Sequence, residues 1–244
     1  MPGSYLQTLA RGIEVLEALK QGARTVNDLA DLIAVERSAV YRLVRTLEHH
    51  GYVVRDGRTG LCRLGLAAWE LGAHTDLAAE VREAASPHLD QLVQRFGETA
   101  HLSLYDRGEV VYIHRVEGTH AIGSYTRLGG RAPAHCVATG KALLAHQPAH
   151  EVDRVIAAGL ARHTPLTIVD GDELRDVLGR VAAGEVAVNR GEWREDVGGL
   201  AVPLVGARGQ AVAAIGLSGP VDRILAQREP ITAALRDAAR AIIR

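Results

Sequence analysis

The spacing of apolar residues changes from a helical to an alternating period within the first 65 residues, and this change constrains the fold most strongly. Leucine and isoleucine recur three or four positions apart over residues 6–19, which predicts an amphipathic helix. Thr25 followed by Asp28 resembles a capping box and predicts the start of a short second helix. A third helix is expected over residues 38–49, with Gly51 as its C-terminal cap.

After the third helix, two short segments carry the signature of a β-hairpin. Residues 52–55 and 61–64 are strand candidates, and residues 56–60 between them have the composition of a turn. Three helices followed at once by a hairpin is the order of a winged helix-turn-helix. Residues 1–65 are therefore predicted to form this DNA-binding module.

The third helix divides into two chemically different faces, as a recognition helix requires. One face is apolar from Val40 to Leu47, and polar and basic side chains lie three or four positions apart on the other. Arginine can bind guanine edges through two hydrogen bonds, while serine and tyrosine can reach bases or phosphates. A solvated helix face would share this pattern, but the basic hairpin that follows favours DNA binding. The expected DNA contacts are Arg37, Ser38, Tyr41, Arg42, Arg45, Arg55 and Arg58.

Residues 66–80 are predicted to form a helical linker, and residues 81–244 a second domain. Pro87 is expected to kink or split the helical stretch over residues 66–97. Beyond this stretch, strands joined by short turns mix with helices, which favours an α+β sensor domain with an antiparallel sheet. The expected strands cover residues 99–105, 110–116, 121–126, 186–190, 200–205 and 211–217, and the expected helices 138–146, 151–158, 173–182 and 231–243.

Charge and cysteine content restrict the cellular setting more than the fold. The formal net charge is −1, so basic residues point to DNA only through their clustering on the third helix and the hairpin. Cys62 and Cys136 lie far apart, which fits a reducing cytoplasm and argues against a zinc finger. No signal peptide is evident, and no apolar run approaches the ~20 residues of a membrane span. A cytoplasmic protein without a membrane partner is expected.

Several motifs, taken in order along almost the whole chain, resemble those of the isocitrate-lyase-regulator (IclR-type) transcription factors. The resemblance rests on residues 10–17, 37–43 and 47–52, which read ARGIEVLE, RSAVYRL and LEHHGY. It continues in residues 133–145, 188–193 and 214–220, which read PAHCVATGKALLA, VNRGEW and AIGLSGP. The resemblance implies a C-terminal domain similar to GAF sensor domains, with a curved antiparallel sheet, that binds a small metabolite. It also implies dimerisation through the N-terminal half, with tetramers in many members.

A ligand pocket in the second domain is a further implication of the resemblance. Matching positions place it at Ala138, Thr139, Asn189, Val197, Gly199, Gly216 and Ser218, with Glu192 and Trp193 in a loop that closes over a ligand or packs at a subunit contact. Gly199 and Gly216 stand where some members present Cys and Ser, which predicts a roomier and less polar pocket. Independently, free N–H groups at a helix start near Ala138 suit a carboxylate or phosphate.

Motifs of catalysis are incomplete in this chain. A phosphate loop would need Gly at position 135 and Ser or Thr at position 142, where His135 and Ala142 stand. A hydrolase elbow around Ser218 would need glycine in place of Pro220. Cys136 and His135 are not expected to form a nucleophilic dyad, because neighbours on an extended segment point to opposite sides.

A metal site is a weaker alternative, in which His101, His114 and His135 converge. A histidine on a strand is more often a satisfied residue of the sheet, so neither a metal nor a cofactor is expected.

The sequence therefore predicts a regulator, not an enzyme, whose operator binding is controlled by a small carboxylate-bearing metabolite. Its partners would be a double-stranded DNA operator, an organic-acid effector and a second copy of the chain, with a tetramer as the alternative. Leu6, Leu9, Trp69 and Leu71 are expected near the contact between copies. A metabolite-processing enzyme with an accessory winged-helix interaction module is the competing interpretation. The effector, the operator sequence and the choice between repressor and activator are left open.

Overall fold

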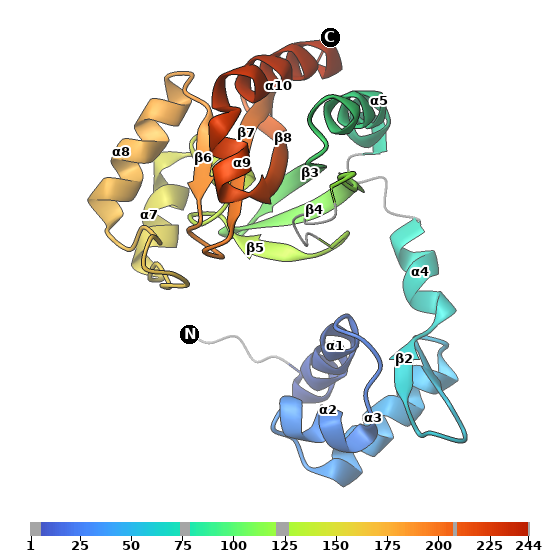
Figure 1. The fold of residues 1–244 in the computed structure, drawn as a ribbon. Helices are drawn as coiled ribbons and strands as arrows, with labels where there is room; N and C mark the ends of the chain where they lie inside the picture. Colours follow the sequence, from blue (N-terminus) through green and yellow to red (C-terminus); the bar gives the residue numbers. More distant parts are fainter. Residues whose placement is uncertain (1–5, 74–78, 121–126, 207–208, 244) are drawn as a thin grey trace. The chain divides into compact units, whose positions relative to one another are not determined.

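The computed structural model describes residues 6–73, 79–120, 127–206 and 209–243, and the chain divides into two compact units. The first unit comprises Met1–Leu77 and the second Ala78–Arg244 (Figure 1). Each unit has its own hydrophobic core. None of the described helices is long and apolar enough to cross a membrane.

The first unit contains the predicted order of three helices and a hairpin, so the winged helix-turn-helix is confirmed. The two strands of the hairpin pair antiparallel, with Val54 opposite Arg63. An isolated bridge between Arg24 and Cys62 ties the segment before the second helix to this hairpin. The elements are α1 (Gln7–Leu19), α2 (Val26–Leu32), α3 (Arg37–His49), β1 (Val53–Arg55), β2 (Cys62–Leu64) and α4 (Leu66–Ala73).

Both predicted helix boundaries in this unit are confirmed by their hydrogen bonds. The Thr25 hydroxyl accepts a hydrogen bond from the Asp28 N–H at 3.2 Å, and the Asp28 carboxylate accepts one from the Thr25 N–H at 2.9 Å. This reciprocal pair is a capping box, and it starts α2. At the end of α3, Gly51 has a φ of +74°, and the Tyr52 N–H reaches back to the Leu47 carbonyl at 2.9 Å. A glycine in this left-handed conformation closes the helix and turns the chain into the hairpin.

The core of the first unit leaves part of α1 uncovered. Val15 and Val40 are fully buried, as expected for the inner faces of their helices. Towards the start of α1, however, Leu6, Leu9 and Ile13 are 76%, 61% and 51% exposed. Only the C-terminal half of the predicted apolar stripe therefore packs within this unit.

The described residues of the second unit form an antiparallel sheet of six strands in the order β5-β4-β3-β8-β7-β6. The expected α+β class with an antiparallel sensor-type sheet is confirmed. The expected strand over residues 121–126 lies outside the described residues. The strands are β3 (Thr99–Asp106), β4 (Glu109–Val116), β5 (Arg131–Pro133), β6 (Ala187–Arg190), β7 (Val197–Val205) and β8 (Ala211–Pro220).

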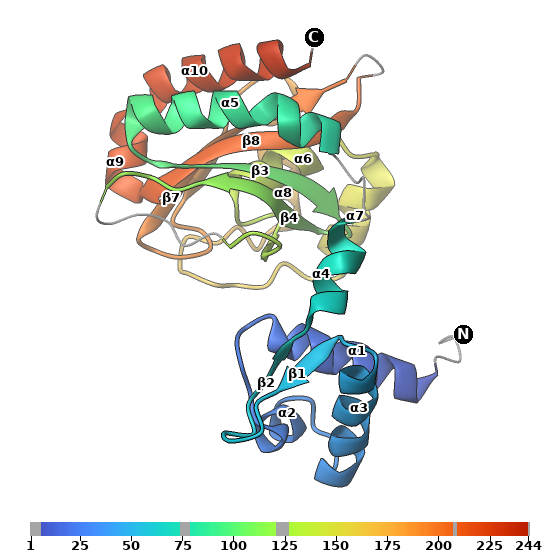
Figure 2. The same cartoon turned by 90° about the vertical axis from the view of Figure 1, so that its right-hand side faces the viewer.

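Helices cover both faces of this sheet. The long helices α5 and α10 lie side by side on one face (Figures 1 and 2). On the other face α6 packs against β7 and β8, and α8 packs behind α6. The helices are α5 (Ala79–Phe96), α6 (Ala138–Leu144), α7 (Ala149–Ala157), α8 (Gly171–Ala182), α9 (Val221–Ala226) and α10 (Arg228–Ile242).

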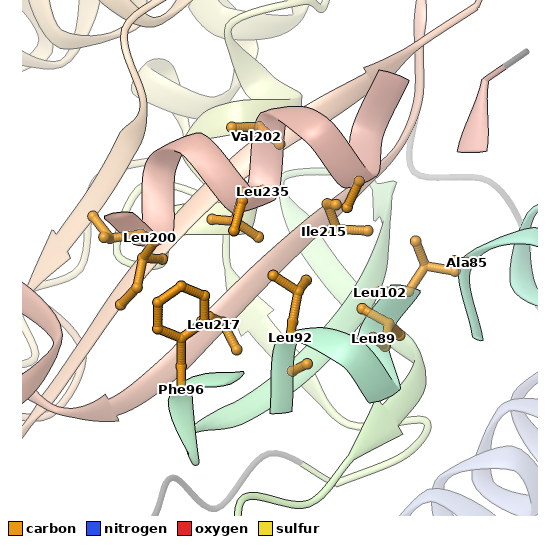
Figure 3. Close-up of a cluster of buried hydrophobic side chains, with 14 of the residues drawn as sticks. Ala85, Leu89, Leu92, Phe96, Leu102, Leu200, Val202, Ile215, Leu217 and Leu235 are labelled. Carbon is orange, nitrogen blue, oxygen red and sulfur yellow. The ribbon is translucent and has the colours of Figure 1, made fainter. Parts of the chain in front are cut away.

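The main core fills the space between α5, α10 and the sheet. Figure 3 shows Leu89, Leu92 and Phe96 of α5 beside Leu102 of β3 and Leu217 of β8. Leu89, Leu102 and Leu217 are fully buried. Burying a side chain of this kind contributes about 1.5–3 kcal/mol, so this layer anchors the sheet.

Pro87 does not split the helix, because α5 runs from Ala79 to Phe96 without interruption. Proline cannot donate a backbone hydrogen bond, and this loss costs about 3 kcal/mol in a helix interior. Ala85 and Leu89 on either side of Pro87 are fully buried. Packing of this apolar face against the sheet and α10 offsets the missing hydrogen bond.

Helix α6 lies unusually close to the turn that precedes it. All of its residues are buried. A Cβ atom at Gly140 would stand 2.3 Å from the carbonyl oxygen and 2.4 Å from the Cα of Ala134. These atoms belong to the backbone and cannot rotate away, so only glycine permits α6 to lie at this depth.

We predict that Gly140→Ala destabilises the second unit by about 3 kcal/mol, because the added methyl group forces α6 away from the Ala134 backbone. The matched control is Gly179→Ala in the exposed interior of α8, where nothing lies within 4 Å of the new methyl group. This control should gain about 1 kcal/mol from the higher helix propensity of alanine. Urea denaturation followed by circular dichroism measures both changes. Equal stability of the two variants would contradict the close approach at Gly140.

Candidate functional site

The predicted division of α3 into two faces is present in the structure. Val40 and Val44 are buried against the core of the first unit. Tyr41, Arg42 and Arg45 are exposed on the opposite face. The helix thus offers two guanidinium groups and a phenol to a binding partner without disturbing its own packing.

The hairpin extends this basic surface through a contact with α3. The Arg55 guanidinium lies 5.5 Å from the centre of the Tyr41 ring, a cation–π distance. The Asp56 carboxylate accepts hydrogen bonds from the N–H groups of Arg58 and Thr59 at 2.9 and 2.7 Å. These bonds lower the pKa of Asp56 and order the turn that presents the exposed Arg58.

The start of α3 contains an acidic cap that sequence reasoning missed. The Glu36 carboxylate accepts hydrogen bonds from the backbone N–H and the hydroxyl group of Ser38. These bonds lower the pKa of Glu36. Ser38 and Arg37 are exposed, but the Ser38 hydroxyl already donates to Glu36 and would have to leave it to bind DNA. The sequence signal for this cap was an acidic residue directly before the helix.

In the second unit, a small cavity lies where the start of α6 meets the sheet. Its volume is about 30 Å³, room for little more than one water molecule. It is lined by the predicted residues Ala138, Asn189, Trp193, Val197, Gly199 and Ser218, and by His101, Tyr112, Val137, Arg194 and Leu217, which were not predicted. A roomier pocket was expected, and the structure shows a small one. An organic ligand fits here only if lining side chains move.

Two buried side chains of the cavity have unused hydrogen-bonding atoms. Among the described residues, neither Nδ1 of His101 nor Oγ of Ser218 has a hydrogen-bond partner. Burial lowers the pKa of His101 to about 4, so its imidazole is neutral at pH 7. A buried polar atom without a partner costs about 1–3 kcal/mol, and a ligand that hydrogen-bonds to it would recover part of that cost.

Gly216 does not provide the space that was expected of it. A Cβ atom there would stand 2.9 Å from the Leu200 carbonyl oxygen and 3.1 Å from Cγ2 of Thr139. Gly216 therefore lets α6 pack on the sheet, and neither it nor Thr139 lines the cavity. Gly199 does line the cavity, and the atoms nearest to its own hypothetical Cβ lie at ordinary contact distances of 3.4 Å or more.

Asn189 forms the turn beside the cavity. Its Oδ1 accepts hydrogen bonds from the N–H groups of Gly191 and Glu192 at 3.1 and 2.8 Å. Its Nδ2 donates to the Val197 carbonyl oxygen at 3.3 Å. The side chain that was expected to bind ligand is thus largely occupied in holding Trp193 and its neighbours in place.

Glu192 is buried beneath this turn and does not line the cavity. Both of its carboxylate oxygens lie 2.6 Å from Nζ of Lys141 on α6. Burial raises the pKa of Glu192 and lowers that of Lys141, while their mutual attraction opposes both shifts. Whether the shared proton lies on Lys141 or on Glu192, the pair carries no net charge. A lysine within an otherwise apolar helix was the sequence signal for this pair.

Trp193 is half-buried at the edge of the cavity, where the Arg194 guanidinium lies 5.6 Å from its ring centre. Arg194 is exposed, so this corner places a positive charge at the cavity rim. The position of Trp193 is compatible with a side chain that closes over a ligand.

The convergence of His101, His114 and His135 on one metal does not occur. His114 pairs with Leu102 across β3 and β4, so its side chain points to the opposite face of the sheet from that of His101. His135 instead approaches His163, with the ring centres 6.3 Å apart.

The expectation that His135 and Cys136 point apart is also wrong. They lie in a turn after β5, where the alternation of an extended strand does not apply. Burial raises the pKa of the Cys136 thiol to about 12, which disfavours a nucleophilic thiolate.

Comparison with known proteins gives one consistent result over both units. Residues 75–244 match the family described as bacterial transcriptional regulator IclR C-terminal, and residues 8–57 match the IclR helix-turn-helix domain. The transcriptional repressor AllR of Klebsiella pneumoniae is 32% identical over 91% of this chain and 83% of that protein. The transcriptional regulator XynR of Escherichia coli K12 is 29% identical over 90% of this chain and 88% of that protein.

A solved structure is similar over almost the whole chain. It is an IclR homologue from Microbacterium hydrocarbonoxydans, crystallised in complex with 4-hydroxybenzoate. The two proteins are 30% identical, with a TM-score of 0.84, over 97% of this chain and 98% of that one. These relatives are regulators of transcription, which removes the enzymatic interpretation.

Proposed function

Because the chain belongs to the IclR family of bacterial DNA-binding transcriptional regulators, we propose that it controls a promoter in the cytoplasm according to the level of a small carboxylic acid. The observation that carries the DNA-binding part is the exposed face of α3, joined to the hairpin through Tyr41 and Arg55. A recognition helix of this kind enters the major groove, while the wing lies along the backbone beside it.

Base contact is assigned to Arg42 and Arg45, and backbone contact to Arg37, Arg55 and Arg58. Arg42 and Arg45 lie three residues apart, so they share one face of α3. Arg58 lies at the tip of the wing turn, where a phosphate or the minor groove is the nearest DNA feature in this docking mode.

The active form is proposed to be at least a dimer. Leu6 directly before α1, Leu9 and Ile13 of α1, and Trp69 and Leu71 of α4 are each more than half exposed. Side chains of this size gather on a protein surface chiefly where a partner covers them. A second copy is the partner that fits, because two winged helices read two half-sites and thereby gain affinity and selectivity.

The effector is proposed to be a small aromatic or short aliphatic carboxylate that opens the cavity below α6. The supporting observation is that two of its lining residues, His101 and Ser218, each have a buried polar atom without a hydrogen-bond partner among the described residues. Arg194 at the rim attracts an anion, and the first N–H groups of α6, next to Ala138, have no carbonyl partner within the helix. The complex of the Microbacterium homologue with 4-hydroxybenzoate makes this acid the first candidate to test.

We predict that Arg42→Ala and Arg45→Ala each weaken DNA binding by about 1–3 kcal/mol, because each removes a contact to a base edge. Binding is measured by gel shift on a DNA site selected from a random library with the parent protein. Lys20→Ala, which removes a basic side chain from the end of α1, should bind like the parent. Unchanged binding by both arginine variants would refute the assignment of α3 as the recognition helix.

For the dimer, we predict that Leu9→Glu lowers the molar mass measured by light scattering at micromolar concentration. The introduced carboxylate would be buried without a partner at the contact between copies. Leu32→Glu is the matched control, since Leu32 of α2 has the same 61% exposure as Leu9. A parent protein that is monomeric under these conditions and still binds DNA tightly would overturn the dimer.

For the effector, we predict that one member of a panel of small carboxylates, headed by 4-hydroxybenzoate, raises the melting temperature and changes the gel shift. A ligand at 100 times its Kd adds about 2.7 kcal/mol of stability. Ser218→Ala should weaken its binding by about 0.5–1.5 kcal/mol, the contribution of one neutral hydrogen bond.

The matched control for this test is Ser103→Ala. Ser103 is also a buried serine of the sheet without a hydrogen-bond partner among the described residues, but it does not line the cavity. Equal loss of ligand binding in the two serine variants would place the effector elsewhere. DNA binding by both variants without ligand should remain that of the parent.

A further inference from the structure

Two histidines and a cysteine meet where the turn before α6 contacts the loop between α7 and α8. One ligand atom from each of His135, Cys136 and His163 lies within 4.8 Å of the other two. None of these residues lines the cavity assigned to the effector. We propose that this cluster binds a divalent transition metal of the zinc class, with the fourth coordination position open to water.

The donor set suits zinc by its chemistry. Imidazole nitrogen and thiolate sulfur are the ligands that zinc prefers, and three protein ligands with one exchangeable position is a recurrent arrangement. In a tetrahedral site with bonds of about 2.0–2.3 Å, the ligand atoms stand roughly 3.3–3.8 Å apart. The distances of up to 4.8 Å between the ligand atoms must therefore shorten by up to about 1.5 Å. The His163 side chain is exposed and free to make this movement, and its side of the cluster admits the ion.

The hydrogen bond of His135 is of the kind that metal-binding histidines make. Its Nε2 lies 3.1 Å from the Ala161 carbonyl oxygen, which can only accept a hydrogen bond. Nε2 is therefore the protonated nitrogen, and Nδ1 of the neutral ring keeps its lone pair for a metal. Metal-binding histidines almost always donate their other N–H to a carbonyl or carboxylate in this way.

The loop that supplies His163 is fixed by the residues that directly follow it. The Thr164 hydroxyl donates to the Gly191 carbonyl oxygen at 2.8 Å, and the Thr167 hydroxyl donates to the Glu192 carbonyl oxygen at 2.6 Å. The His163 N–H in turn donates to the Thr167 hydroxyl at 3.0 Å. The backbone beneath the third ligand is thus already in place before a metal arrives.

The surroundings of Cys136 tolerate an added cation. The charged groups that interact with its thiol are Lys141 and Glu192, which form a pair without net charge. When the metal–sulfur bond forms, the thiol proton leaves to solvent, so one proton is released for each ion bound. The bound metal would join the α7–α8 loop to the turn that precedes α6.

The test uses the full-length protein, freed of metal with a chelator, dialysed and kept reduced, and titrated with cobalt(II) as a spectroscopic substitute for zinc. We expect saturation at one cobalt per chain, a thiolate-to-cobalt charge-transfer band, visible bands of four-coordinate cobalt, and displacement by zinc. His163→Ala should weaken binding roughly tenfold or more, because it removes one ligand. Cys136→Ala should abolish the charge-transfer band.

The cobalt titration has a control variant, and three of its possible outcomes would contradict the proposal. His150→Ala removes an exposed histidine of α7 outside the cluster and should bind cobalt like the parent. His163 is exposed, so His163→Ala tests the site even if Cys136→Ala fails to fold. Cobalt binding without a charge-transfer band, binding unchanged by His163→Ala, or no saturable binding would each overturn the proposal. None of these results bears on the effector cavity.

Discussion

The buried ion pair between Lys141 and Glu192 joins the segments on which both candidate sites of the second unit depend. Both side chains are almost fully buried, and both carboxylate oxygens contact Nζ at 2.6 Å. Burial of such charges is costly, and loss of one partner would leave an uncompensated group at a cost of about 3–5 kcal/mol. The Glu192 carboxylate also accepts a hydrogen bond from the Arg190 N–H, and the Glu192 backbone carbonyl accepts one from the Thr167 hydroxyl. One glutamate therefore holds α6, the β6–β7 turn and the α7–α8 loop together.

This junction adjoins the small cavity that is proposed to bind the effector. Trp193 and Arg194 follow Glu192 directly, and they line the cavity opposite the start of α6. The glutamate holds their backbone, while at the rim the Trp193 side chain is only half-buried and the Arg194 side chain is exposed. The proposed opening of the cavity would thus involve its rim more than its floor. A ligand shifts such an equilibrium only by its differential affinity for the open and closed arrangements.

The first unit is organised differently, around a small core that leaves apolar surface uncovered. The fully buried Val15, Val40 and Leu29 bring α1, α2 and α3 together, yet Leu6, Leu9 and Ile13 remain in contact with water. A unit of this size cannot bury every apolar side chain of its helices by itself. The uncovered residues are available for contacts between copies, while the basic face of α3 remains free. The proposed assembly and DNA binding thus draw on different helices of the same unit.

Local features of the sequence were sufficient to predict the winged helix, its caps and the basic face of α3, because capping boxes, left-handed glycines and helical periodicity depend on neighbours within a few residues. They also indicated most of the strands and the antiparallel class of the sheet. The sequence did not reveal that α5 continues through Pro87, because burial of that helix offsets a local defect. It also did not show that Gly216 packs against Thr139 of α6, or that Glu192 pairs with Lys141 of the same helix. It also missed the meeting of Cys136 with His163, which lies 27 residues further along. Tertiary packing alone decided these contacts, since they join segments that no periodicity or spacing relates.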